Sequence, residues 1–391
     1  MPDSRTALGV PRQMKLYREG LAGNPPTLPI AASEWEAQAM RLLSPQAGAY
    51  LGGAGREDTM AANLEAFDHW RICPRMMTDI STRDLSTNLW GLPLRAPVLL
   101  APIGLQELYH RDAEIATARA AAQASVPFIL SCQSSRSIEQ VAAVAGDTPQ
   151  FFQLYWSQSA EFTESLVHRA ENANYAAIVL TADTKMLGWR ERDLALGHNP
   201  FLEGKGIANY LSDPVFQQLA KKSGASTEAA NVETFLKVFS KPALRWEDLA
   251  WLRKLTRLPI VLKGIQHPAD AQLAIEHGMD GLIVSNHGGR QVDGGVATLD
   301  MLPAIADTVA RRIPVGIDSG IRNGADAFKA LALGADFVCL GRPYIHALAV
   351  AGESGVREFI ENFLCDLELT LALSGRTRWS EVTAEMCVKP A

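Results

Sequence analysis

The spacing of apolar residues along the chain changes near residue 97. Before that point the spacing is helical, because Met40 and Leu43 follow Ser33-Glu34-Trp35-Glu36, a capping-box pattern that predicts a helix start. A second helix is expected over 57–67, where apolar residues recur on one face. We therefore expect residues 1–96 to form an N-terminal helical extension.

After this extension, short apolar runs alternate with alanine-rich helical segments. Near-continuous apolar runs separated by helices are typical of parallel strands that are covered on both faces. Eight such runs over roughly 245 residues match an α/β (β/α)8 TIM barrel, here over 97–345. An open doubly wound sheet would have fewer strands, and no strand is followed by G-x-G-x-x-G. The predicted strands are Pro97–Ala101, Pro127–Leu130, Gln150–Leu154, Ala176–Asp183, Pro259–Lys263, Gly281–Ser285, Pro314–Asp318 and Phe337–Gly341.

The gap between the fourth and fifth predicted strands is unusually long. About 75 residues separate Asp183 from Pro259, far more than one loop and helix need. We expect a long loop insert over about 198–241, acting as a lid over the site, with a disordered insert as the alternative. Residues 346–391 are expected to add C-terminal helices, so that 1–391 forms a single domain.

Composition and charge narrow the class of protein. Apolar residues make up 47% and charged residues 20%, as in a globular protein with a sizeable core. A net charge of -6 gives no electrostatic reason to expect nucleic acid as a partner. No secretion signal or bilayer-spanning stretch is present, and the five cysteines are scattered. We therefore expect a cytoplasmic protein with reduced thiols and no membrane partner.

Polar and ionisable residues gather where the predicted strands end. Active sites of such barrels lie at the carboxyl ends of the strands, so these residues should meet on one face. Arg322 and Arg342, with Gly320 and Gly341 beside them, could cradle a phosphate after the last two strands. The alternative is a pair of surface arginines at helix starts. The strand ends carry Ala101-Pro102-Ile103, Ser131-Cys132-Gln133, Gln153-Leu154-Tyr155, Thr181-Ala182-Asp183, Lys263, Ser285 to Arg290, Asp318 to Arg322 and Gly341-Arg342.

The sixth strand end carries the candidate base. His287 is followed by two glycines, and an imidazole can accept a proton near neutral pH. The guanidinium of Arg290 could donate two hydrogen bonds to a carboxylate. Asp183 could orient the imidazole, and Lys263 could stabilise an anionic ring. The alternative for His287 is a histidine hydrogen-bonded within a turn. We predict no metal, because His110, His198 and His267 show no paired ligand spacing.

The stretch Ser-Asn-His-Gly-Gly-Arg-Gln at 285–291 resembles the active-site signature of the FMN-dependent 2-hydroxy acid oxidases and dehydrogenases. Shorter matches at 101–104, 152–155, 180–183, 262–264, 318–322 and 341–343 extend the resemblance. It implies FMN as the cofactor, a small 2-hydroxy acid and O2 as partners, and a homo-oligomer, tetramer or octamer.

The resemblance also implies roles for individual residues. His287 would take the substrate hydrogen or hydroxyl proton, with Asp183 supporting it and Lys263 near the flavin pyrimidine edge. Substrate contacts would come from Tyr50, Tyr155, Arg190 and Arg290. The flavin and its phosphate would contact Ala101, Pro102, Ile103, Ser131, Gln153, Thr181, Lys263, Ser285, Asp318, Gly320, Arg322, Gly341 and Arg342.

Several further stretches, including 188–194 and 209–217, most resemble the lactate 2-monooxygenases. That branch converts L-lactate and O2 to acetate, CO2 and water. The alternatives are an oxidase that releases keto acid and peroxide, or a dehydrogenase with another acceptor. Gln133 stands where family members often carry an aromatic or aliphatic residue, which favours a different or larger acid. A non-catalytic barrel that binds a phosphorylated ligand is the alternative from another class.

Overall fold

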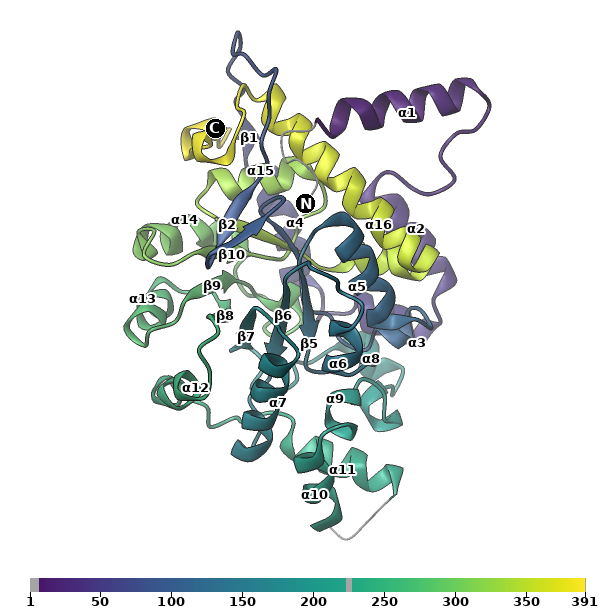
Figure 1. Ribbon diagram of the computed structural model, residues 1–391, viewed down its shortest axis with the longest axis vertical. Coiled ribbons are helices and arrows are strands. Elements are labelled where there is room, and N and C mark those ends of the chain that lie inside the picture. Colours follow the sequence, from purple (N-terminus) through teal and green to yellow (C-terminus); the bar gives the residue numbers. More distant parts are fainter. Residues whose placement is uncertain (1–6, 223–226, 391) are drawn as a thin grey trace.

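The computed structural model describes residues 7–222 and 227–390, and its centre is a closed barrel of eight parallel strands (Figure 1). The expected (β/α)8 barrel is confirmed, and each strand lies within one or two residues of its predicted position. In barrel order the strands are β10 (Val315–Ile317), β11 (Phe337–Leu340), β4 (Val98–Leu100), β5 (Phe128–Ser131), β6 (Gln150–Leu154), β7 (Ala177–Thr181), β8 (Ile260–Ile265) and β9 (Gly281–Val284).

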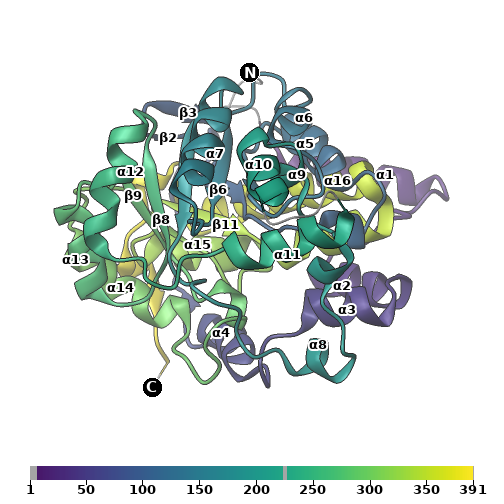
Figure 2. The ribbon, with the colours of Figure 1, turned by 90° about the horizontal axis from the view of Figure 1, so that it is seen from below.

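Helices follow the strands and cover the outside of the barrel (Figure 2). Their alanine-rich faces pack against strands that are buried on both sides, as parallel strands require. These helices are α5 (Ala113–Ala124), α6 (Ile138–Ala142), α7 (Ala160–Asn172), α12 (Leu249–Leu255), α13 (Pro268–Glu276), α14 (Thr298–Val309), α15 (Gly324–Ala332) and α16 (Arg342–Leu373).

A hairpin closes the amino-terminal end of the barrel. It is made by β2 (Thr87–Leu89) and β3 (Leu92–Leu94), and its turn residue Trp90 packs edge-on against Phe151 and Phe337 of the barrel interior. The Trp90 indole also donates a hydrogen bond to the Asp280 carbonyl. With this end plugged, only the carboxyl end of the barrel is left for a ligand.

The N-terminal extension is helical, as expected, only as far as Asp68, and its remaining part carries β1 (Arg71–Ile72) and the β2–β3 hairpin in place of helices. It holds α1 (Gly9–Leu21), α2 (Ala32–Leu42), α3 (Pro45–Gly52) and α4 (Asp58–Asp68), and Figure 1 shows α1 projecting beyond α2 and α16. The predicted capping box at Ser33 is wrong, because α2 begins two residues earlier than that box implies and its N-cap, Ala31, has no side-chain cap. Residues 1–6 lie outside the described residues.

The extra segment after β7 lies where the strand spacing predicts it, but its described residues are largely helical. It contains η2 (Pro200–Glu203), α9 (Ala208–Leu211), α10 (Pro214–Lys222) and α11 (Glu228–Val238), while residues 223–226 lie outside the described part. Phe201, Tyr210, Phe216 and Phe235 are almost fully buried and pack on one another. Tyr210 and Phe216 also contact Phe162 of the barrel helix α7, so this aromatic core fixes the segment to the barrel.

The C-terminal region differs in part from the expected helices. Helix α16 already starts at Arg342, directly after β11, and is interrupted at Ala351 and Gly352. Beyond it come two short turns and the strand β12 (Cys387–Val388), which pairs with β1 at the end of the N-terminal helices. The division into a single domain with these boundaries stays a prediction. None of the described helices combines the length and apolar character needed to cross a bilayer.

Candidate active site

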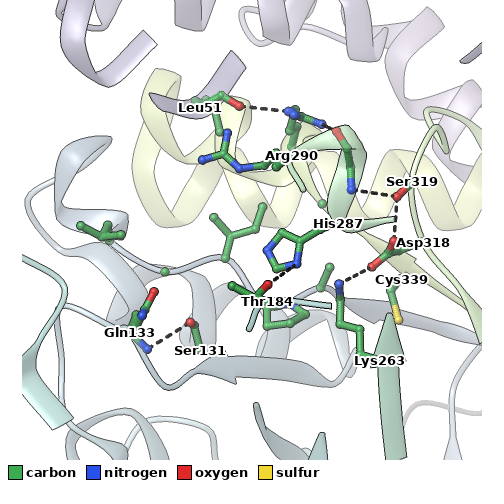
Figure 3. Close-up of a pocket in the computed structure, with 18 of the residues that line it drawn as sticks. Leu51, Ser131, Gln133, Thr184, Lys263, His287, Arg290, Asp318, Ser319 and Cys339 are labelled. Carbon is green, nitrogen blue, oxygen red and sulfur yellow. Dashed lines mark hydrogen bonds and ion pairs between the residues drawn. The ribbon is translucent and has the colours of Figure 1, made fainter. Parts of the chain in front are cut away.

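A cleft of about 1060 Å³, counted with its mouth, opens at the carboxyl ends of the strands (Figure 3). This size suits a mononucleotide together with a small acid. Almost every strand of the barrel contributes a side chain to its wall. The lining includes these sequence-predicted residues: Tyr50, Ala101, Pro102, Ile103, Ser131, Tyr155, Arg190, Lys263, His287, Arg290, Asp318, Gly320, Arg322, Gly341 and Arg342, and also Gln133.

Four predicted residues lie just behind this lining: Gln153, Thr181, Asp183 and Ser285. The Gln153 Oε1 atom accepts a hydrogen bond from Ser131 Oγ at 3.1 Å, whereas its Nε2 donor is buried without a partner among the described residues. The Thr181 hydroxyl is equally buried and has no partner in the described part of the chain. Because buried polar groups without a partner are costly, these atoms point to a polar ligand against β6 and β7.

His287 and Asp183 form a hydrogen-bonded pair across the cleft. The His287 Nδ1 atom lies 2.9 Å from Asp183 Oδ1, and the Thr184 hydroxyl donates to the same carboxylate oxygen at 2.8 Å. With Nδ1 engaged, Nε2 is the ring nitrogen left for a ligand. The His287 backbone has a φ of 59°, an uncommon conformation for a non-glycine residue and one that recurs at functional sites.

Electrostatics keep this pair in the form that a base requires. Burial, together with the cations Lys263 and Arg190, lowers the pKa of His287, although Asp183 opposes the change. Burial alone would raise the pKa of Asp183, but His287 and Lys263 overcome it and the pKa is lowered. Near neutral pH the imidazole is therefore uncharged beside a charged carboxylate, so it can accept a proton.

Lys263 is a buried cation with its own counter-charge. Its ammonium group lies 3.1 Å from Asp318 Oδ2 (Figure 3). It also donates to Ser285 Oγ at 2.8 Å. Burial would lower the pKa of Lys263, but Asp318 and Asp183 raise it further than burial lowers it. Lys263 is therefore charged, held rigidly in the wall and only 3% exposed.

Two arginines face the same end of the cleft as His287. The Arg290 guanidinium donates to the carbonyls of Tyr50 and Gly53 and lies 4.9 Å above the Tyr50 ring, while Arg190 lies 5.6 Å from that ring. Tyr155 lines the wall nearby, and burial raises its pKa, which keeps the hydroxyl protonated. Such a set can bind a small carboxylate and a hydroxyl.

Arg322 and Arg342 also line the cleft, and Arg342 donates to the carbonyls of Leu51 and Gly288. Burial, then Arg290 and Arg322, lower the pKa of Arg342 to about 9, and its buried Nη2 has no hydrogen-bond partner among the described residues. Within residues 7–222 and 227–390, neither arginine forms an ion pair with a carboxylate. A cation this buried without a counter-ion fits a bound anion.

Glycines make room for that anion. A side chain at Gly320, where φ is +90°, would meet the Asn63 carbonyl at 2.1 Å, so this turn requires glycine. A Cβ at Gly341 would find only Ile103, at 3.9 Å, and so would project into the cleft. The open cradle, the free Arg342 donor and the unpartnered Gln153 and Thr181 groups together fit FMN.

Several site residues were not predicted from the sequence. Thr184 links Asp183 to His287, and the Ser319 hydroxyl accepts from the Gly288 amide and donates to Asp318. Asn63 of α4 exchanges two hydrogen bonds with Asn286 and so braces the turn that carries His287. Thr184 and Ser319 adjoin predicted residues and could have been found, whereas only the fold brings Asn63 to the site.

Comparison with known proteins gives one family. The model of the FMN-dependent dehydrogenases matches residues 39–389. An L-lactate oxidase of Lysinibacillus sphaericus is 44% identical over 350 residues, covering 89% of this chain and 90% of its own. An FMN-dependent alpha-hydroxy acid dehydrogenase of Schizosaccharomyces pombe is 41% identical, covering 93% and 92%.

Solved structures give the same picture. A crystal structure of mandelate oxidase with (S)-4-hydroxymandelic acid is 35% identical, with a TM-score of 0.82. The match covers 90% of this chain and 97% of that one. The likeness therefore extends beyond the barrel itself, over most of the chain.

Proposed function

Because the chain belongs to the FMN-dependent dehydrogenase family, we propose that it oxidises a small L-2-hydroxy acid, L-lactate above others, with O2 as the acceptor. The family establishes FMN as the cofactor. One observation carries the proposal: the uncharged His287, paired with Asp183, shares a cleft with arginines that lack a carboxylate partner among the described residues. A base beside arginines without an internal counter-charge suits a substrate that carries both a carboxylate and an acidic proton.

In this proposal Arg290 and Arg190 bind the substrate carboxylate, and Tyr50 and Tyr155 hydrogen-bond the carboxylate and hydroxyl. This binding places the α-carbon near the imidazole and removes much of the entropy cost of bringing the groups together. His287 Nε2 takes a proton from the substrate, and Asp183 stabilises the imidazolium that forms. Bound FMN supplies the two-electron acceptor.

The remaining predicted residues would hold the cofactor. Arg322 and Arg342, with Gly320, Gly341 and Asp318, would hold the phosphate end. Lys263 would place a fixed positive charge beside the flavin ring, where negative charge develops on reduction. The ring would contact Ala101, Pro102, Ile103, Ser131, Gln153, Thr181 and Ser285. A homo-oligomer in the cytoplasm remains our expectation for the assembled protein.

The fate of the keto acid is the finer part of the proposal. We propose that pyruvate and peroxide react before leaving, giving acetate, CO2 and water, as in the lactate 2-monooxygenases. Support comes from the sequence likeness at 188–194 and 209–217. The second candidate is an oxidase that releases both products, which is favoured by the names of the relatives, L-lactate oxidase and 2-hydroxyacid oxidase.

Product analysis separates these candidates. Purified holoenzyme is incubated with L-lactate in air, and acetate, pyruvate and peroxide are quantified. Acetate with little free peroxide supports the monooxygenase, whereas equal amounts of pyruvate and peroxide support the oxidase. A panel of larger acids tests whether Gln133 selects another side chain. Flavin that no 2-hydroxy acid reduces under anaerobic conditions would refute the proposal altogether.

A further inference from the structure

The chain after β7 has a short first part that lines the cleft. We call residues 184–197 the gate segment. Three of its side chains, Thr184, Leu187 and Arg190, form part of the cleft wall. It ends at Gly197, where φ is +58°, and the aromatic core of the extra segment begins just beyond it.

The gate segment is pinned at its base. The Gln291 amide donates to the carbonyls of Asp183 and Met186 at 3.0 and 2.9 Å, and its oxygen accepts from the Gly188 amide at 3.3 Å. A Cβ at Gly188 would come within 2.5 Å of the Arg290 carbonyl, so the two backbones touch here. The base therefore moves together with the loop that carries His287 and Arg290.

Apolar contacts of the gate segment are few. Met186 and Trp189 are 64% and 74% exposed, and Leu194 and Leu196 are about half exposed. By contrast, Phe201 and Tyr210 of the extra segment are at most 3% exposed. Since buried apolar area is the main source of local stability, the gate segment is held far more weakly than the segment that follows it.

One ion pair ties the outer part of the gate segment, residues 189–197, to the N-terminal extension. Arg192 of α8 (Glu191–Ala195) meets Glu57 in a bidentate pair, with Nε–Oε1 at 2.5 Å and Nη2–Oε2 at 2.6 Å. The guanidinium lies across the turn after α3, since a Cβ at Gly52 would be 3.3 Å from it. Figure 2 shows α8 beside α3, apart from α9 to α11.

Neighbouring residues of this outer part face opposite ways. Arg190 turns inward over the Tyr50 ring, whereas Arg192 turns outward to Glu57. The carboxylate of Asp193 also turns inward, because its Oδ1 is buried and Arg290 and Arg190 counter the burial that raises its pKa. Breaking the Arg192–Glu57 pair would therefore free the stretch that carries a substrate arginine.

We propose that Arg192 and Glu57 are positioning residues that latch the gate segment closed and set how long the keto acid stays in the cleft. The inference rests on the proposed function, since it assumes that the carboxylate of the acid binds to Arg290 and Arg190. The pair is bidentate but partly solvated, with side chains 48% and 22% exposed, so it can form and break during each turnover. The gate is thus the short segment 184–197, while the extra segment after it is fixed.

The test compares Arg192→Glu, Glu57→Arg and the double charge swap. Oxalate, which has no α-hydrogen, serves as the probe, and its dissociation from oxidised holoenzyme is followed by flavin absorbance. Each single variant should release oxalate about 3- to 10-fold faster, and the swap should return most of the way to wild type. In air with L-lactate, the single variants should shift products from acetate towards pyruvate and peroxide.

Arg56→Glu is the matched control, because Arg56 pairs with Asp58 on the same turn but does not contact the gate segment. It should leave oxalate release and product ratio unchanged. Single variants with wild-type release rates, a swap without rescue, or a wild type that binds no oxalate would overturn the latch. Failure of the proposed function can be distinguished from failure of the latch, because the wild-type flavin would then stay oxidised with every 2-hydroxy acid.

Discussion

Two groups of residues in the cleft handle buried charge in opposite ways. In the paired group, Lys263 forms an ion pair with Asp318, and the uncharged His287 is hydrogen-bonded to Asp183. In the unpaired group, Arg322 and Arg342 have no carboxylate ion-pair partner within the described ranges, and the pKa of Arg342 falls to about 9. Paired groups hold a geometry whether or not a ligand is bound, while unpaired cations need the ligand's own charge.

This difference assigns a separate role to each group. Residues that must keep a defined protonation state are compensated by the protein itself, which suits proton transfer. Cations without an internal counter-charge suit binding, because a bound anion neutralises them. The two groups should therefore fail separately when mutated.

Replacing His287 by alanine should have the largest effect. Loss of the base is expected to slow anaerobic flavin reduction by L-lactate about 1000-fold, while the FMN content stays at wild-type level. Stopped-flow absorbance measures the rate, and the flavin-to-protein ratio measures the content. His69→Ala, at an exposed residue of the N-terminal extension, is the control. Loss of flavin from His287→Ala would contradict the separation.

Arg342→Gln should have the reverse effect. Removing one charge from the unpaired group is expected to weaken FMN binding about 100-fold, with the His287–Asp183 geometry intact. Titration of apoprotein with FMN, followed by flavin fluorescence, gives the affinity. Arg111→Gln, whose side chain is 90% exposed, is the control. Unchanged FMN affinity in Arg342→Gln would show that Arg342 does not hold the phosphate of FMN.

Asp183→Asn tests the paired group through the pH dependence of kcat/KM. The pKa of His287 lies below its usual value, so kcat/KM should be level near neutral pH and should fall only as acid protonates the base. Asp183 raises that pKa, so its loss should move the acidic limb to lower pH and reduce the maximum rate about 10-fold. A limb that moves to higher pH would be inconsistent with this coupling.

The smallest effect is expected for Thr184→Val. The hydroxyl lies 2.8 Å from Asp183 and 3.2 Å from His287, so it adds to a pair whose own hydrogen bond forms without it. Losing one such hydrogen bond should lower the reduction rate about 3- to 10-fold and leave FMN binding unchanged. Steady-state kinetics and a flavin titration suffice here, and a loss as large as that of His287→Ala would show that the role of Thr184 is underestimated.

The sequence predicted the barrel well because its strands are short apolar runs, and the family prediction is confirmed by the comparisons. The strand-end rule also placed most cleft residues on one face. What local patterns cannot predict are contacts between distant segments, such as Asn63 with Asn286 or Trp90 in the barrel base. The helices after Gly197 were missed because their aromatic core forms only in three dimensions.

One anaerobic experiment tests the central claim, that a base and an anion cradle serve one flavin cleft. Wild type, His287→Ala and Arg342→Gln, each saturated with added FMN, are mixed with L-lactate, and bleaching of the protein-bound flavin is recorded. We expect bleaching in wild type and Arg342→Gln but almost none in His287→Ala. Rapid bleaching in His287→Ala, or oxidised flavin in all three proteins, would contradict the account.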